Sequence, residues 1–132
     1  MPKQATSDSD IERCFDVMHE LRTELMRDTF LDTVRAMEQD GYKLAFIEDS
    51  IDDTPTVVAA AGYRITTNLF MGKHLYVDDL VTVQKSRSKG YGEHLIKWLR
   101  EQALNADCNY FHLDSGTHRD QAHKFYFRQG FK

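Results

Sequence analysis

The spacing of hydrophobic positions changes between helical and strand-like along this chain. Apolar residues that recur every three or four positions predict four helices, over residues 11–22, about 28–40, 92–106 and 119–131. Strand-like hydrophobic runs cover residues 42–48, 56–65, 75–83 and 109–114. Ser9 and Glu12 have the spacing of a capping box at the first helix, and Gly41 is placed to end the second.

The order of these elements predicts an α+β fold with one mixed sheet. The segments "DSIDDTP" and "NLFMGKH" are turn candidates, so the first three strands are expected to form an antiparallel meander. The strand–helix–strand unit over residues 75–113 predicts a parallel strand pair within the same sheet. A chain of 132 residues without repeat or linker has the length of a single domain, residues 1–132.

Charge is distributed unevenly over a composition that is otherwise ordinary for a soluble protein. The net charge of -4 argues against a general nucleic-acid or membrane-surface binder. Residues 1–60 hold 14 acidic and 6 basic side chains, whereas residues 61–132 hold 7 acidic and 11 basic ones. This asymmetry fits solvated helix faces, or a first half that meets a cationic ligand and a second half that meets an anionic one.

Neither a secretory signal nor a membrane span is recognisable in the sequence. The N-terminus, "MPKQATSDSD", lacks an apolar core, and no run approaches the roughly 18 apolar residues that span a bilayer. Cys14 and Cys108 are too few and too far apart to form a disulfide framework. We therefore expect a cytoplasmic protein with reduced thiols.

A cationic glycine turn precedes the helix at 92–106. In "RSKGYGEHLIKWL", residues 87–99, Arg87 and Lys89 flank the start of a turn that contains Gly90 and Gly92. Glycines let the backbone approach a ligand closely, and the first N–H groups of a helix carry partial positive charge, which suits a phosphate group. The stretch matches neither a Walker loop nor a dinucleotide fingerprint, and a plain turn explains it equally well.

Two carboxylates interrupt the apolar strand just before this turn. Asp78 and Asp79 lie within "LYVDDLVTV". They predict a bulge, where pairing breaks and backbone groups become free for a ligand. The alternative is that each Asp faces solvent on a half-exposed strand.

Three stretches together resemble the GCN5-related N-acetyltransferase (GNAT) superfamily. "LVTVQKSRSKGYGEHLI" is similar to the family's strand-to-helix acetyl-CoA signature, R-x-x-G-x-G behind a hydrophobic strand. "AHKFYFRQGF" resembles its A-x-x-F-Y-x-x-x-G-F element, and "NYFHLDSG" stands between the two as the family's next strand. The resemblance covers about residues 42–132. It implies a twisted mixed sheet flanked by about four helices, and acetyl-CoA as the acetyl donor.

The resemblance also implies roles for individual residues. The backbone of Val81 and Val83 would pair with the pantetheine arm, and an N–H group of the strand at 80–82 would stabilise the oxyanion. The amides from Arg87 or Ser88 through Gly92 would hold the pyrophosphate. Arg119 stands where many members have Asn, and would reach a phosphate or the adenine ribose instead. The complete set of expected cofactor-binding residues is Leu80, Val81, Val83, Arg87, Ser88, Lys89, Gly90, Tyr91, Gly92, Arg119 and Phe125.

Proton transfer needs an acid and a base. Tyr126 occupies the family position of the general acid, and a tyrosine pKa near 10 suits protonation of a thiolate; the alternative is a tyrosine packed in the core beside Phe125. The candidate bases are Asp78, Asp79 and Glu48, with Asp114 a weaker choice and a water chain an alternative. No metal is expected, because His118 and His123 lack partners at a metal-ligand spacing.

Two departures from the family affect the expected fold and assembly. The segment "KQATS" predicts a weak or absent first strand, and the chain stops at Lys132, before the one or two further strands that family members have. We expect these C-terminal strands to be missing through truncation, or their edge to be covered in a homodimer.

The acidic first half favours a small cationic amine as acceptor, such as a polyamine or amino sugar. The alternatives are a protein or peptide amine as acceptor, or a module that binds acetyl-CoA without turnover.

Overall fold

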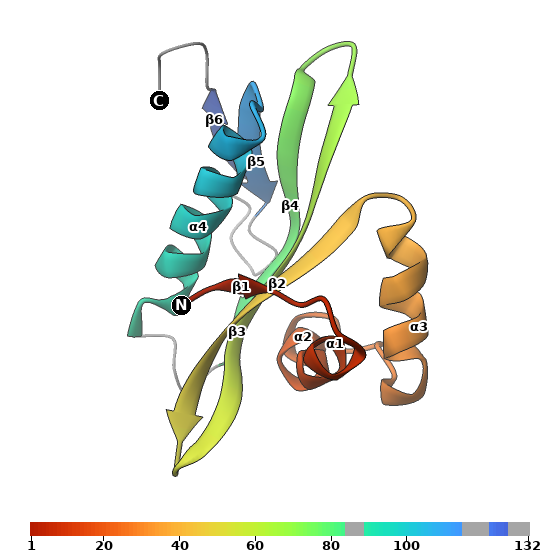
Figure 1. The fold of residues 1–132 in the computed structure, drawn as a ribbon, viewed down its shortest axis with the longest axis vertical. Helices are drawn as coiled ribbons and strands as arrows, with labels where there is room; N and C mark the ends of the chain where they lie inside the picture. The colour runs from red at the N-terminus through yellow and green to blue at the C-terminus, as the bar shows by residue number, and fades with distance from the viewer. Residues whose placement is uncertain (84–88, 115–121, 127–132) are drawn as a thin grey trace.

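Six strands form one mixed sheet in the order β1-β2-β3-β4-β5-β6 (Figure 1). The computed structural model describes residues 1–83, 89–114 and 122–126. All neighbouring strands are antiparallel except β4 and β5, which are parallel. The elements are β1 (Lys3–Gln4), α1 (Asp8–Arg13), α2 (Phe15–Leu21), α3 (Arg27–Glu38), β2 (Tyr42–Ile51), β3 (Thr54–Asn68), β4 (Gly72–Thr82), α4 (Tyr91–Asn105), β5 (Tyr110–Asp114) and β6 (Ala122–Tyr126).

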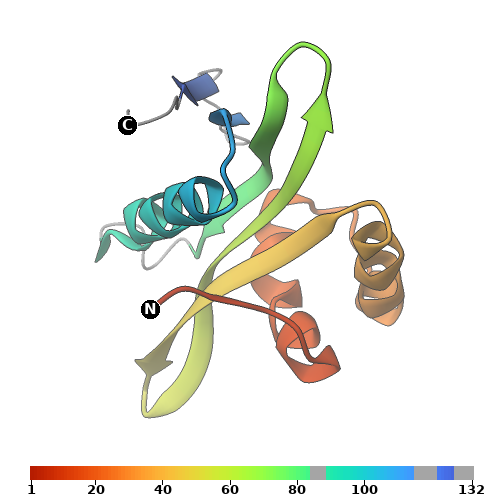
Figure 2. The same cartoon turned by 45° about the horizontal axis from the view of Figure 1, so that its top comes forward.

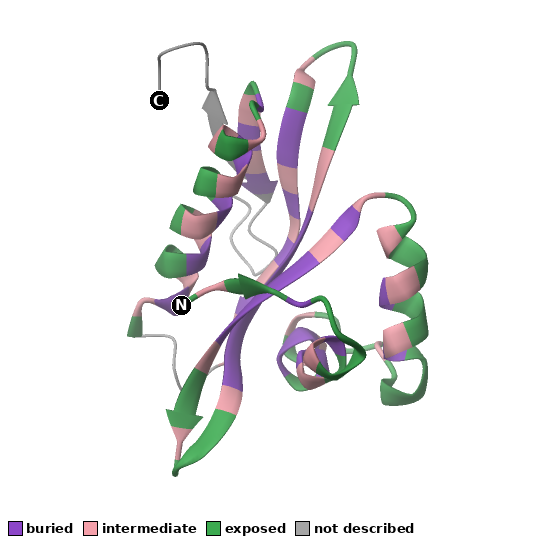
Figure 3. Ribbon diagram, in the orientation of Figure 1, coloured by how far each residue is buried: buried purple, intermediate pink, exposed green. Residues whose placement is uncertain are grey.

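Helices cover both faces of the sheet, as the two views in Figures 1 and 2 show. Helix α4 packs on one face through its buried positions Leu95, Leu99 and Ala103, which belong to one apolar cluster. Helices α1 to α3 pack on the other face, where Ile11, Phe30 and other buried residues form a second cluster. Burial is concentrated where the central strands pass between these helices, and the hairpin tips are exposed (Figure 3). No helix of the described residues is long and apolar enough to cross a membrane.

The predicted α+β class, the antiparallel meander and the parallel strand pair are confirmed. The meander is β2-β3-β4, and the parallel pair is β4 with β5. The first strand is present but short, with only Lys3 and Gln4. Its weakness follows from the polar sequence around it.

A β-bulge lies in β4 where the sequence predicted one. Gly62 pairs with Asp79 and Tyr63 pairs with Val77, so Asp78 is an extra residue on β4 that no β3 residue faces. A bulge bends the strand and redirects the side chains on either side of it. Here it brings Asp78 and Asp79 to the lining of the same pocket.

Strands β4 and β5 pair over only part of their length. Their register runs from His74 with Tyr110 to Val77 with Leu113, whereas β4 continues to Thr82. Beyond the bulge, β4 therefore keeps β3 as its neighbour on one side and has no register with β5 on the other. This end of β4 leads toward α4.

The helix predicted over 119–131 is wrong where the structure describes it. Residues 122–126 form strand β6, antiparallel to β5, with Tyr126 opposite Tyr110. Phe and Tyr favour strands as well as buried helix faces, and the free edge of β5 offers a full ladder of backbone hydrogen bonds.

The first helix is also more divided than predicted. It ends at Arg13 and restarts at Phe15, so Cys14 separates α1 from α2. The cap is Ser7, whose Oγ accepts from the Asp10 N–H at 3.0 Å, and the predicted capping box at Ser9 is wrong.

Candidate functional site

A pocket of about 490 Å³ opens beside the β4 bulge, on the face covered by α1 to α3. Its walls come from α2, the following loop, α3 and the three central strands. One side is apolar, and the other carries carboxylates, guanidinium groups and a phenol. The lining residues are Met18, Arg22, Leu25, Phe30, Thr33, Val34, Met37, Asp40, Tyr42, Arg64, Asp78 and Asp79.

Asp79 is held in a buried network. One carboxylate oxygen, Oδ1, accepts from Arg22, at 2.9 Å from Nε and 2.8 Å from Nη2. The other, Oδ2, accepts from the Tyr42 hydroxyl at 3.0 Å. Burial, and then the neighbouring Asp79 charge, raise the pKa of Tyr42 well above its usual value, so the phenol remains a proton donor. Asp79 thus has a partner on each oxygen.

Tyr42 reaches Asp79 only because residue 62 is a glycine. Tyr42 lies on β2 and Asp79 on β4, so the side chain must cross the intervening strand β3. A Cβ atom on Gly62 would lie 2.7 Å from Tyr42 Cε1 and closer still to its hydroxyl oxygen. Gly62 therefore leaves the space in which the phenol ring crosses the sheet.

Asp78 has a different environment from its neighbour. Arg64 binds its carboxylate with two hydrogen bonds, Nε to Oδ2 at 2.9 Å and Nη2 to Oδ1 at 2.7 Å. The side chains of Arg64 and Asp78 are 42% and 23% exposed, against 12% for that of Asp79. The hydrogen bonds to Asp78 raise the pKa of Arg64. Both aspartates carry half-exposed counter-ions, 46% for Arg22 and 42% for Arg64, but the carboxylate of Asp78 is the more open of the two.

The structure does not bring Glu48 to this pocket. Glu48 pairs with Arg13 at 3.1 Å and lines a separate hollow with Met1 and Lys3. Its β3 partner is Val57, five residues from the β3 partner of Asp79. That separation corresponds to roughly 15 Å along the strand. Of the predicted bases, Asp78 and Asp79 lie together and Glu48 lies apart.

The glycine turn caps α4 at the end of β4. Gly90 adopts a left-handed conformation with φ +79°, and its carbonyl accepts from the His94 N–H at 3.1 Å, so the earlier N–H groups of the first turn have no acceptor within the helix. A Cβ on Gly92 would lie 3.6 Å from Thr82 Oγ1, which places this turn against the last residue of β4. A long helix whose first N–H groups have no acceptor within the helix, beside a glycine, suits a phosphate group.

Two side chains near this turn connect it to β2. Tyr91 is buried and donates a hydrogen bond from its hydroxyl to Asp49 Oδ2. That hydrogen bond is the main reason why the pKa of Asp49 is lowered, and the charge of exposed Lys89 adds to the effect. Arg87, Ser88 and Arg119, which were predicted to bind the cofactor, lie outside the described residues.

The pairing of β4 with β3 decides which backbone groups of β4 face away from β3. The Val83 N–H donates to Val58 O of β3 at 2.9 Å, so it is not available to a pantetheine arm. Because hydrogen-bonding direction alternates along a strand, Val81 faces β3 as well, whereas the N–H and C=O groups of Leu80 and Thr82 face away from β3. The Val83 N–H is therefore bound by β3, the pairing of Val81 and Val83 with pantetheine stays a prediction, and among the described residues the groups of Leu80 and Thr82 are the ones that the register directs away from β3.

Tyr126 and Phe125 lie on β6, on the far side of β5 from β4. Their side chains are outside the described part of the structure, as is that of Asp114, so their predicted roles stay predictions. The described residues contain no group of three His, Cys, Asp or Glu side chains that could hold a metal ion.

Sequence reasoning missed the partners of the two aspartates. Arg22, Tyr42 and Arg64 come from three different elements, and Arg22 is 57 positions from Asp79. One signal was present, because a glycine inside a strand run, as in "AAAGYRI", often marks the close approach of another group. Nothing in the sequence marked Arg22.

A family and two curated proteins that match this chain are acetyltransferases by name. The acetyltransferase (GNAT) family matches residues 9–131. "Uncharacterized N-acetyltransferase YhdJ" of Bacillus subtilis (strain 168) is 34% identical over 124 residues, 94% of this chain and 85% of that protein. The aminoalkylphosphonate N-acetyltransferase of Salmonella typhimurium (strain LT2) is 32% identical over 56 residues, 42% of this chain and 36% of that protein.

A solved structure has the same fold. The crystal structure of an aminoglycoside 6'-N-acetyltransferase complexed with coenzyme A matches with a TM-score of 0.66 at 13% identity, covering 86% of this chain and 60% of that one. The family match over nearly the whole chain, the relative at 34% identity and the mixed sheet with its bulged central strand agree. The chain belongs to the GNAT family and is an acetyltransferase.

Proposed function

We propose that this acetyltransferase moves the acetyl group of acetyl-CoA to a primary amine of a small molecule, by direct attack in a ternary complex. The observation that carries the proposal is the position of both half-sites on β4. Thr82 contacts the helix start suited to phosphate, and Asp78 lines the pocket. The two residues are four positions apart, about 13 Å along a strand.

The donor half-site has groups suited to coenzyme A. The unpaired N–H groups in the first turn of α4 suit the pyrophosphate, with Lys89 beside them. The outward-facing backbone of Leu80 and Thr82 offers a strand edge to the pantetheine amides, and the Leu80 N–H is suited to the developing oxyanion. The aminoglycoside acetyltransferase of similar fold contains coenzyme A, which supports this choice of donor.

The acceptor half-site suits an amine. An alkylammonium ion must lose a proton before its nitrogen attacks the thioester carbonyl. Asp78 is the carboxylate we assign to this step, directly or through water, because its side chain is 23% exposed against 12% for Asp79, and because Asp79 is also bound by the buried Tyr42 hydroxyl. The related proteins that act on aminoalkylphosphonates or aminoglycosides support a small amine. We favour a cationic one, because Asp40 adds a third carboxylate to the lining.

In the proposed reaction the amine nitrogen forms a bond to the acetyl carbon and the carbon–sulfur bond breaks. The ammonium gives its first proton to Asp78 or water before the attack, and the departing thiolate takes a proton from the Tyr126 hydroxyl. The second proton that the nitrogen loses returns to the Tyr126 phenolate through water. We place this reaction in the cytoplasm, a proposal supported by the free thiols of Cys14 and Cys108.

The test is thiol release from acetyl-CoA over a panel of primary amines. Turnover with at least one amine supports the proposal, and coenzyme A binding by calorimetry without turnover of any amine favours a binding module. Tyr126→Phe is expected to lower kcat by about 100-fold with little change in the KM of the amine. A variant as fast as wild type at every pH would remove Tyr126 from the acid role.

A further inference from the structure

We propose that Arg64 determines acceptor specificity by occupying the Asp78 carboxylate until the ammonium group of the acceptor displaces it. This inference rests on the proposed function, and it names the chemical class of the acceptor and the residue with which the acceptor competes. In this proposal Asp78 exchanges its ion-pair partner when the acceptor binds, whereas the adjacent Asp79 keeps both of its partners.

Asp79 cannot exchange its partners at low cost. Its side chain is 12% exposed, and its two oxygens are bound by Arg22 and by the buried phenol of Tyr42. Arg22 itself is 46% exposed, so the cost of exchange lies at the carboxylate and the phenol. Releasing either donor leaves a nearly buried Asp79 oxygen without its partner, and releasing Tyr42 leaves a buried hydroxyl without an acceptor, which is unfavourable. The Arg22 guanidinium also donates to the Asp78 carbonyl oxygen at 3.3 Å, so it fixes the bulge backbone as well.

Asp78 can exchange its partner. Arg64 is 42% exposed, much like Arg22, but the Asp78 carboxylate is 23% exposed and no buried hydroxyl of the described residues binds it. Such a pair contributes little net stability because water solvates both ions when they separate. An ammonium group entering the pocket offers Asp78 another charged donor. The exchange therefore costs little beyond moving a long, flexible side chain.

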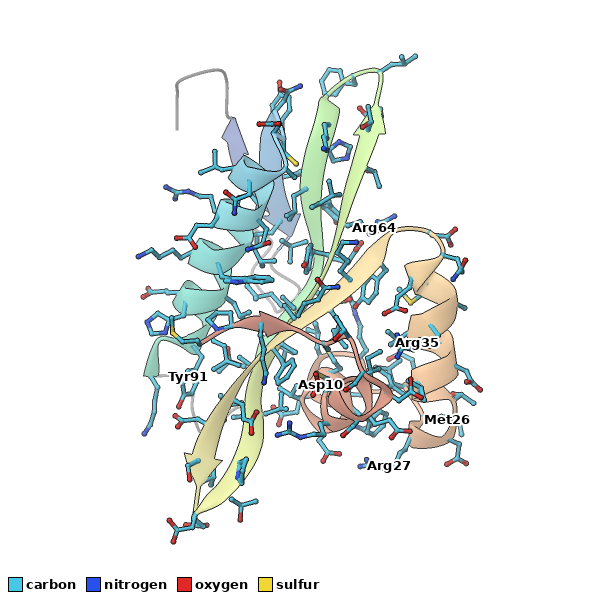
Figure 4. The ribbon with its side chains drawn as sticks, viewed as in Figure 1. Asp10, Met26, Arg27, Arg35, Arg64 and Tyr91 are labelled. Carbon is cyan, nitrogen blue, oxygen red and sulfur yellow. The ribbon has the colours of Figure 1, made fainter. Side chains whose placement is uncertain are left out.

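A second carboxylate is placed to receive the displaced guanidinium. Arg64 is the β3 partner of Tyr42, the first residue of β2, and Asp40 precedes Tyr42 by two positions. Figure 4 shows Arg64 beside the connection from α3 to β2, which contains Asp40. Asp40 and Arg64 line the same pocket, and the Asp40 charge contributes to the raised pKa of Arg64. Arg64 can thus turn from Asp78 toward Asp40 without losing an anionic neighbour.

The opposite wall defines the remainder of the acceptor. Five apolar side chains line it: Met18, Leu25, Phe30, Val34 and Met37. An apolar wall facing an exchangeable carboxylate fits a primary amine with an alkyl or aryl body. Phenethylamine has both features and serves as the probe.

The experiment measures phenethylamine binding by isothermal titration calorimetry at pH 7, without acetyl-CoA. Arg64→Gln is expected to lower the Kd about threefold to fivefold, because the probe no longer has to displace an exposed ion-pair partner. Asp78→Asn is expected to raise the Kd at least tenfold. Adding Arg64→Gln to Asp78→Asn should then change nothing, whereas a general charge effect would still lower the Kd in that background.

Arg35→Gln is the matched control. Arg35 pairs with Glu38 at side-chain exposures of 37% and 26%, close to those of the Arg64 pair, but Arg35 does not line the pocket. Its Kd should equal that of wild type. A second readout needs no variant: the NMR signal of the Arg64 Nε–H should shift with probe occupancy, while that of Arg22 should not.

Three results would overturn the proposal: weaker or unchanged binding by Arg64→Gln, an equal gain in Arg35→Gln, or no binding by any of these proteins. The outcome is independent of turnover. If no amine is acetylated but the Kd values change as expected in the variants, the proposed function fails, and the competition between Arg64 and the amine for Asp78 is still supported. If acetylation occurs without the Kd pattern, only the role of Arg64 fails.

Discussion

Replacing Gly62 with alanine tests the packing that holds Tyr42 against Asp79. The new Cβ would lie 2.7 Å from Tyr42 Cε1, a distance that real side chains do not tolerate, and Tyr42 is 4% exposed. Overpacking costs about 1–3 kcal/mol, and losing a buried hydrogen bond to a carboxylate costs about 1.5–3 kcal/mol. We expect Gly62→Ala to lower the free energy of unfolding by about 3–5 kcal/mol.

Urea unfolding followed by circular dichroism measures this loss as a lower midpoint with an unchanged slope. Two comparisons make the result specific. In a Tyr42→Ala background Gly62→Ala should cost less than about 1 kcal/mol, because the clashing ring is gone. Gly92→Ala should be neutral or stabilising, because its Cβ would meet only Thr82 Oγ1 at 3.6 Å and alanine favours the helix. A cost below about 1 kcal/mol for Gly62→Ala in the wild-type background would refute the reasoning.

The remaining predictions concern charge and thiol burial. Asp79→Asn should lower the free energy of unfolding by about 1.5–3 kcal/mol, because it removes the charged acceptor of the buried Tyr42 hydroxyl and of Arg22, whereas Asp78→Asn should cost less than about 1 kcal/mol. Equal urea midpoints for the two variants would contradict the difference in carboxylate exposure. Tyr91→Phe should raise the pKa of Asp49 toward its usual 3.8 in an NMR titration. In the wild type the lowered pKa contributes stability above pH 3.8 that is lost as pH falls through the folded pKa, so the variant should lose less stability in acid. Burial raises the pKa of Cys14 to about 12, so this thiol should not react with Ellman's reagent at pH 8 in the native protein, and rapid native labelling would show that the site opens.

Hydrophobic periodicity was sufficient to predict most of the sheet and α4. The three central strands and α4 each bury one face or both, so their patterns were unambiguous. Residues 119–131 were ambiguous, because aromatic residues suit a helix face and a strand equally well. What decided residues 122–126 was the free edge of β5, a tertiary feature that no local pattern contains.

The chemistry of the site was predictable only in part. Asp78 and Asp79 stood out because carboxylates interrupt an apolar strand, but their sequence setting made them equivalent. Their difference comes from the partners that reach them from separate elements: Arg22 and the buried Tyr42 hold Asp79, whereas Arg64 holds the more exposed Asp78. The register of β4 with β3 likewise decided which N–H and C=O groups of β4 face away from β3, and these belong to Leu80 rather than to Val81.

The bulge at Asp78 links these features into one arrangement. Side chains alternate along a regular strand, so Val77 and Val81, four positions apart, would face the same side. Instead Val77 packs in the cluster under α4 and Val81 in the cluster under α1 to α3, because the extra residue reverses the alternation. The same reversal places two successive carboxylates on the pocket side and lets the backbone of Leu80 face the gap toward β5. The proposed proton acceptor, Asp78, is the inserted residue itself, and the proposed oxyanion donor, the Leu80 N–H, follows two positions later on the same strand.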